Sequence, residues 1–245
     1  MEMLITDLTR MQNQHICVAG IDLGSGKRVR PVLAGGAQFS LDMARHHGGP
    51  FDIRRVVDLG ETKPVPSPPE IEDVEVSPSA IRRIRLMPPP DFLTHLSSAA
   101  IPNAQTAIGP ALKRHLNGTS MVCPEGQGEC SLAIQLANKE FQVTVDGFGR
   151  LRAAWANGIN LSITDLRLYE ADGATPDQDE ITALQKRLAA HFSQSRAVYI
   201  AFGLTRPVSL PRTGDATVYH WLQVNSIHLE DNLSWRLPKL PEGVS

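Results

Sequence analysis

Short stretches of apolar and β-branched residues, separated by turn residues, recur along this 245-residue chain. Runs of roughly four to eight such residues, bounded by Gly, Asn, Asp or Pro, are typical of β-strands. In the first half of the chain they predict strands at 3–8, 15–21, 27–33, 51–59 and 71–76. In the second half they predict strands at 131–136, 141–145, 151–156, 159–163, 198–204 and 218–229.

Turn signals join neighbouring strands into hairpins. A Gly-Ser-Gly at 24–26 separates the second and third strands, and the Asn-Gly at 157–158 is the strongest short hairpin signal in the chain. A longer helix is predicted at 176–192. The Thr-Pro-Asp at 175–177 is a helix start signal, and apolar residues follow it at helical spacing.

The segment from 77 to 118 has a different pattern. Ser77 and Pro78 can open a short helical turn that the prolines at 88–90 end. Further helices are predicted at 91–100 and at 108–116, the second of which is followed by an Asn-Gly stop signal.

The order of elements in the second half predicts its fold. Several meandering strands, one helix and two closing strands are the order of an OB-fold, a small five-stranded barrel. The first half has a similar order with more insertions. We therefore expect a mainly β chain of two OB-fold-like five-stranded barrels in tandem with a few short helices. The first would span 1–122, including a helical and Pro-rich segment, and the second 123–245, including the helix at 176–192.

The strand at 218–229 carries an unusual number of polar residues. Side chains alternate along a strand, so the even-numbered residues from 220 to 228 should share one face and the odd-numbered residues from 221 to 227 the other. Since Leu222 and Val224 are apolar, the even face is the expected core face. Trp221, Gln223 and Asn225 would then point outward, where a ligand could meet them.

Composition narrows the classes of function. Lys and Arg number 24 against 26 Asp and Glu, so a nucleic acid could be bound only through a local basic patch. Three cysteines, an odd number, fit reduced thiols in the cytoplasm. The chain contains neither a secretory signal nor the roughly 20 consecutive apolar residues of a membrane span, so we expect a cytoplasmic protein without a membrane partner.

Basic and aromatic residues supply a candidate ligand-binding set. OB-folds hold single strands by stacking bases on aromatic rings while Lys and Arg contact the phosphates. The set comprises Lys27, Arg28, Arg30, Trp155, Thr205, Arg206, Trp221, Gln223 and Asn225, with Arg212 and Tyr219 as neighbours. In the alternative interpretation, the tryptophans belong to the core and the arginines to a solvated rim.

Two Arg-Pro pairs could mark equivalent points of the two halves. Arg30 and Arg206 each precede a proline at the expected end of a strand, and both could face one cleft. It is equally consistent with the sequence that these arginines pair with Asp22 or Asp165 to lock a loop.

Signals for catalysis or metal binding are weak. Asp165 follows a strand, where a carboxylate usually accepts turn N–H groups. Cys123 and Cys130 are too far apart for the usual zinc spacing, and His46-His47 has no companion ligands nearby in the sequence. There is no G-x-S-x-G, and the Gly-Ser-Gly-Lys ending at Lys27 lacks the first glycine of a phosphate-binding loop. We expect no enzyme activity, metal or cofactor.

Several phrases, in this order, resemble the bacterial dual OB-containing domain family. They are CVAG at 17–20 with KxxRPV at 27–32, LSITD at 161–165, GLTRP at 203–207 and HWLQVNxI at 220–227. The resemblance implies two OB-folds and recognition of nucleic acid or nucleotides in prokaryotic conflict systems such as phage defence. The expected partner is single-stranded DNA or RNA, or a nucleotide. The alternative is an adaptor that docks a partner enzyme.

Overall fold

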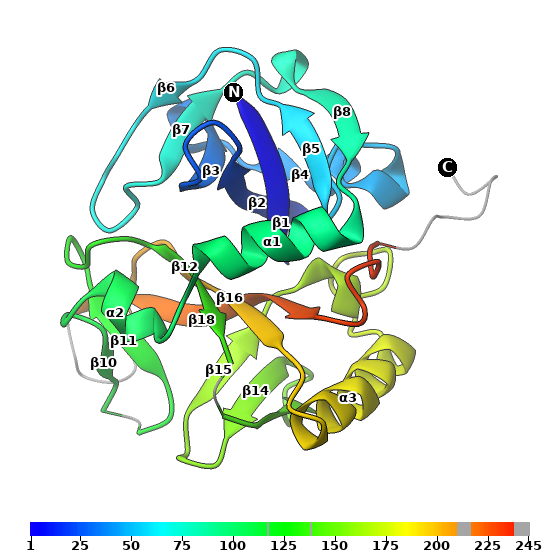
Figure 1. Ribbon diagram of the computed structural model, residues 1–245. Coiled ribbons are helices and arrows are strands. Elements are labelled where there is room, and N and C mark those ends of the chain that lie inside the picture. The colour runs from blue at the N-terminus through cyan, green and yellow to red at the C-terminus, as the bar shows by residue number, and fades with distance from the viewer. Residues whose placement is uncertain (117, 138, 210–216, 238–245) are drawn as a thin grey trace.

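The computed structural model describes residues 1–116, 118–137, 139–209 and 217–237, and their strands form two sheets, in the upper and lower halves of Figure 1. The first sheet contains β1 (Glu2–Arg10), β2 (His15–Asp22), β3 (Arg28–Leu33), β4 (Phe39–Ser40), β5 (Arg55–Asp58), β6 (Lys63–Pro64), β7 (Asp73–Val76) and β8 (Arg82–Leu86). The second contains β9 (Ala100–Ile101), β10 (Lys113–Arg114), β11 (Met121–Pro124), β12 (Leu132–Leu136), β13 (Phe141–Val145), β14 (Leu151–Trp155), β15 (Asn160–Ile163), β16 (Val198–Leu204), β17 (Val208–Ser209) and β18 (Val218–Leu229).

The helices are α1 (Pro89–Ala99), α2 (Ala104–Ile108) and α3 (Gln178–Ser193) among the described residues. We call the first sheet with α1 the first lobe, and the second sheet with α2 and α3 the second lobe. The prediction at 176–192 is confirmed by α3, whose N-cap Asp177 accepts hydrogen bonds from the backbone N–H groups of Asp179 and Glu180. The prediction at 91–100 is confirmed by α1.

The pairing of strands in each sheet follows the OB order. In the second lobe β13, β14 and β15 form an antiparallel meander, β15 runs parallel to β18, and β18 pairs with β16. β12 directly precedes β13 in the chain and pairs with β16, whereas β13 pairs with β14. β12 and β13 together therefore correspond to the first strand of the OB-fold. In the first lobe β1, β2 and β3 meander, β3 runs parallel to β7, and β1 pairs with β5. The predicted mainly β fold with two OB-like units is confirmed, although the described strands form open rather than closed sheets.

The helical prediction for 77–118 is partly wrong. After a short 3₁₀ turn at Pro78–Ala80, the chain forms the edge strand β8, in which arginine alternates with apolar residues. The helix expected at 108–116 is replaced by the earlier α2 and by β10, because Asn103 caps the chain there through a hydrogen bond from the N–H of Gln105. Strands β9, β10 and β11 join the second sheet, so the change of sheet falls near Ala100, ahead of residue 123.

The two lobes are packed against each other over a continuous apolar core. Tyr199 and Ala201 of β16 belong to the same buried cluster as Phe92 of α1, which crosses the junction in Figure 1. Backbone hydrogen bonding also crosses the junction, from Arg10 N to Thr164 O at 2.8 Å. These contacts fix how the two sheets sit relative to each other.

A carboxylate reinforces this junction. Glu72, directly before β7, accepts hydrogen bonds from the backbone N–H groups of Ser131 and Leu132, each at 2.9 Å, and from the Ser131 hydroxyl at 2.9 Å. Glu72 and Ser131 are both buried. The first lobe thus satisfies the N–H groups at the start of β12, which is the start of the second OB unit.

A β-bulge in β18 alters the predicted alternation. Ala201 pairs with Ser226 but Phe202 pairs with Val224, so Asn225 is an extra residue in the ladder. Ile227 therefore joins Val224 in the core of the second lobe, and the buried His228 faces the first lobe, where its Nε2 donates to Thr6 O at 3.0 Å. The expected faces are correct up to Val224 and wrong beyond it, because one inserted residue reverses the side chains that follow.

Candidate functional site

The structure brings Arg30 and Arg206 to the same point, at the junction of the lobes. Arg30 Nε donates to Asp73 Oδ1 at 2.6 Å, and Arg206 Nη2 donates to Asp73 Oδ2 at 2.7 Å. Arg206 Nη1 also lies 3.3 Å from Glu70 Oε1. The two arginines thus meet as the two Arg-Pro pairs suggested, but they face carboxylates of the first lobe rather than Asp22, Asp165 or an open cleft.

The other basic candidates lie at the start of β3. Lys27 is exposed in the turn that precedes this strand. Arg28 donates to the Thr6 hydroxyl and pairs with the buried carboxylate of Asp7, whose pKa is raised by burial against the lowering effect of Arg28. The guanidinium group of Arg28 therefore points to the interior of the protein and bonds to Thr6 and Asp7 there. Arg212 falls outside the described residues.

Of the candidates on β18, Trp221 and Gln223 are half-buried and Asn225 is buried. The ring of Trp221 lies 4.9 Å from that of His115, and Trp221 N donates to Thr205 Oγ1 at 2.9 Å. Thr205 thus fixes the backbone at Trp221. The predicted outward direction of the Asn225 side chain is wrong, because the bulge turns this side chain against Gly203.

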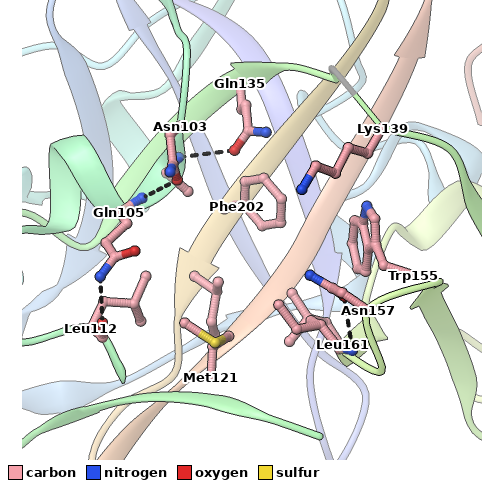
Figure 2. Close-up of a pocket in the computed structure, with 13 residues that line it drawn as sticks. Asn103, Gln105, Leu112, Met121, Gln135, Lys139, Trp155, Asn157, Leu161 and Phe202 are labelled. Atoms are coloured by element: carbon pink, nitrogen blue, oxygen red, sulfur yellow. Dashed lines mark hydrogen bonds between the residues drawn. The ribbon is translucent and has the colours of Figure 1, made fainter. Parts of the chain in front are cut away.

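Trp155 is the candidate that lines a cavity. The cavity measures about 300 Å³ and lies in the second lobe, between the β14–β15 hairpin and the segment around α2 (Figure 2). Trp155 and Phe202 are its aromatic rings. Its apolar floor and walls include Leu112, Met121, Leu161 and Leu222.

Side-chain amides surround these rings, and backbone contacts fix their orientation. The side-chain oxygens of Asn103, Gln135 and Asn157 accept from backbone N–H groups at 2.9, 2.9 and 3.1 Å. Each amide therefore keeps its NH₂ group available as a donor. Gln105 is the reverse case, since its Nε2 donates to Leu112 O at 3.2 Å and leaves its oxygen as an acceptor.

An exposed lysine completes the donor set. Figure 2 shows the nitrogens of Lys139 and Asn157 directed toward the space between Phe202 and Trp155. The cavity thus combines two aromatic rings with an ammonium group and three amide donors. Such a pocket suits a flat, acceptor-bearing heterocycle.

The comparisons with known proteins identify the family. The family model described as the dual OB-containing domain matches residues 1–227. The chain belongs to the dual OB-containing domain family. The resemblance seen in the sequence phrases is thereby confirmed. Comparison with curated proteins and with solved structures gave no significant match.

For a dual OB-containing domain, the cavity is well placed. OB-folds bind oligonucleotides and oligosaccharides over strands 2 and 3 and the adjoining loops. In the second lobe those strands are β14 and β15, and Trp155, Asn157 and Leu161 come from them and from their turn. Membership of the family supports a binding module, and the cavity borders these two strands.

The sequence does not predict most of the residues that line the cavity of this dual OB-containing domain. Asn103 and Gln105 belong to the α2 segment, which packs across the second lobe from a position before it in the chain. Lys139 and Gln135 lie beside a turn of ordinary composition. The one available signal is the polar Asn-Gly turn after Trp155, which by itself predicts only a hairpin.

Of the residues considered for chemistry, Asp165 has structural partners. Asp165 accepts from the backbone N–H groups of Arg167 and Ile227 and pairs with the Arg167 guanidinium at 2.6 Å, as a turn former does. Burial raises the pKa of the Cys130 thiol to about 11. Across the described residues, no group of three or more His, Cys, Asp or Glu side chains is placed to hold a metal ion. No described helix is long and apolar enough to span a bilayer.

Proposed function

We propose that this dual OB-containing domain is a non-enzymatic binding module that recognises single-stranded nucleic acid, or a nucleotide, by taking a base into the cavity of the second lobe. The observation that carries this proposal is the pairing of Trp155 and Phe202 with oriented amide donors beside β14 and β15. Base–aromatic stacking contributes about 1–3 kcal/mol per base. Hydrogen bonds to the base edge would add selectivity.

The donor-rich lining supports a preference among bases. The amides of Asn103, Gln135 and Asn157 offer NH₂ groups, and Lys139 offers an ammonium group. Uracil and thymine carry two carbonyl acceptors on their edges, whereas adenine carries an amino donor. We therefore expect carbonyl-rich pyrimidines to bind more tightly than adenine.

The cellular setting is proposed from the family. An accessory role in a prokaryotic conflict or phage-defence system, in the cytoplasm, fits a module that recognises nucleic acid while a partner supplies the chemistry. The module would then act as the sensor of that system.

Fluorescence anisotropy with labelled oligo-dT, oligo-U and oligo-dA at several salt concentrations tests the proposal. We expect binding that weakens with salt, tighter binding of oligo-dT and oligo-U, and a loss of about tenfold in Trp155→Ala with partial recovery in Trp155→Phe. Ile71→Ala removes an exposed apolar side chain of the first lobe, outside the cavity, and serves as the matched control. Absence of binding, or equal binding by Trp155→Ala, would refute the proposal.

The adaptor function is the alternative outcome. If no oligonucleotide or nucleotide binds, purification from the native host should bring down a protein in stoichiometric amount and no nucleic acid. That result would place the function in protein docking instead.

A further inference from the structure

A positively charged site, separate from the cavity, lies on the first lobe, where several arginines gather near the carboxylate of Asp52. Figure 1 shows β5 and β8, which contribute to it, on the opposite side of the molecule from α2, whose residues help to line the cavity. We call these residues the arginine cluster: Arg45, Arg54, Arg55, Arg83 and Arg236.

Several separate segments converge to build the arginine cluster. Arg45 begins a 3₁₀ turn at Arg45–His47, and Arg236 comes from the end of the described chain. Arg54 has a φ of 68°, a left-handed conformation that turns the chain into β5 at Arg55. Arg83 arrives through the pairing of β8 with β5, opposite Val57.

Asp52 cannot balance this charge. Its buried carboxylate lies 3.1 Å from Arg45 and 3.7 Å from Arg236, and it also accepts from the backbone N–H of Leu237 at 3.4 Å. Burial, followed by the charge of Arg236, lowers the pKa of Arg54. Arg55 has its pKa lowered by burial, with contributions from Arg83, Arg45 and Arg236. The guanidinium groups thus repel one another.

Two hydrogen-bond donors of the cluster have no acceptor. Arg54 is only 6% exposed, and the Nε atoms of Arg54 and Arg55 are both buried without a hydrogen-bond partner. Buried N–H groups are nearly always satisfied in folded proteins, so two such donors in one place are free to bond to an acceptor from outside the chain. The cluster remains open to solvent, because Arg83 is exposed and the side chains of Arg45 and Arg236 are about a fifth exposed, at 18% and 20%.

The junction of the lobes shows the contrast with a structural arginine pair. There Arg30 and Arg206 face two carboxylates, Asp73 and Glu70, so the two positive charges are balanced within the protein. In the arginine cluster, among the described residues, Asp52 is the one carboxylate that forms an ion pair with any of the five arginines, and it pairs with Arg45 and Arg236.

We infer that the arginine cluster is an anion site that binds a phosphate group. Planar guanidinium forks match the oxygens of phosphate, and several together neutralise its charge. The phosphate could belong to a nucleic-acid strand or to a small phosphate compound, since the chemistry is shared. This site is separate from the cavity and does not depend on base recognition there.

Isothermal titration with pyrophosphate at low salt tests the inference without any base present. The double variant Arg55→Gln/Arg83→Gln should bind at least tenfold more weakly than the wild type. Arg196→Gln is the matched control, because it removes an exposed arginine that pairs with Asp231 on the second lobe, and it should bind as the wild type does. No binding by the wild type, or equal binding by the double variant, would overturn the inference.

Circular dichroism checks that the double variant folds. If it does not, Arg83→Gln alone decides, because Arg83 is exposed and its replacement leaves the interior intact. We expect about fivefold weaker binding from that single change, and unchanged binding would count against the site.

Competition identifies the source of the phosphate. An oligonucleotide with a 5′-phosphate and its 5′-hydroxyl counterpart are added to the pyrophosphate complex. Displacement by both indicates backbone phosphates, displacement by the first alone indicates a terminal phosphate, and displacement by neither indicates a small phosphate compound. All three results are consistent with an anion site and differ only in what it serves.

Discussion

Arg206 of the second lobe is joined to Asp73 of the first by a hydrogen bond of 2.7 Å between Nη2 and Oδ2. The same carboxylate holds Arg30 through its other oxygen, at 2.6 Å. Asp73 therefore connects both OB units, and it does so next to Glu72, which satisfies the N–H groups at the start of β12. The junction is a built interface and not an open cleft at this point.

Asp73→Asn should be far more damaging than Arg206→Gln. The first change leaves Arg30, whose side chain is 6% exposed, without a carboxylate, and breaking a buried pair in this way costs about 3–5 kcal/mol. The Arg206 side chain is 51% exposed, so its loss should cost about 1 kcal/mol or less. Urea unfolding measures both free energies, and equal losses would contradict this assignment of roles.

Glu72→Gln should loosen the junction. The amide of Gln keeps a neutral oxygen for the N–H groups of Ser131 and Leu132 and turns its NH₂ group toward the Ser131 hydroxyl, so the charge-assisted hydrogen bonds to these buried donors are lost at a cost of about 1–3 kcal/mol. Glu75→Gln on the neighbouring β7 is the control, because Glu75 is only half-buried and makes no contact of this kind. A free energy of unfolding that is lowered equally by both changes would refute the role of Glu72.

Gly20→Ala should disrupt the first sheet. A Cβ atom at Gly20 would lie 2.2 Å from Leu4 O, a backbone atom of the paired strand that cannot move aside. Overpacking of this kind costs about 1–3 kcal/mol and sometimes more. Gly147→Ala, where a Cβ meets nothing within 4 Å, should change the thermal midpoint little. A stable Gly20→Ala protein with an unchanged midpoint would show that β1 and β2 pair differently.

Acid should destabilise the protein through its buried histidines. Burial, and then the neighbouring His47, lower the pKa of His46 to about 4, and burial lowers the pKa of His228 as well. The unfolded chain binds these protons near pH 6.5, so stability is complete above about that pH and is lost as the pH falls toward 4. Urea midpoints at about pH 7.5 and pH 5 should differ less in His46→Gln than in the wild type. An equal fall in both proteins would contradict this.

The elements that were predictable from the sequence are those with local signals. Every strand predicted from the pattern is present at least in part, and Asp177 begins α3 at the Thr-Pro-Asp start signal. The sequence does not predict β8, because its arginines indicate an exposed polar segment. Only the pairing with β5 makes this segment a strand. The reversal after Val224 was missed because a bulge depends on the partner strand and not on local alternation.

The candidate site was only partly predictable, for a related reason. Trp155 was identified, but the amides that face it come from α2 and β12, and only tertiary packing places them together. The basic patch that a nearly neutral chain would need for phosphate was expected at Arg28, Arg30 and Arg206. Those residues face acids, and the unbalanced arginines come from segments distant in sequence.

Photocrosslinking tests the central claim, that a base enters the cavity, most directly. A single-stranded oligonucleotide carrying 5-bromouracil is bound, irradiated and digested with protease, and the modified peptides are identified by mass spectrometry. We predict crosslinks to Trp155 or Phe202, suppressed by excess oligo-U and absent in Trp155→Ala with Phe202→Leu. Crosslinks confined to Trp221 or to other residues away from the cavity, or no specific crosslink in a complex that forms, would contradict the claim.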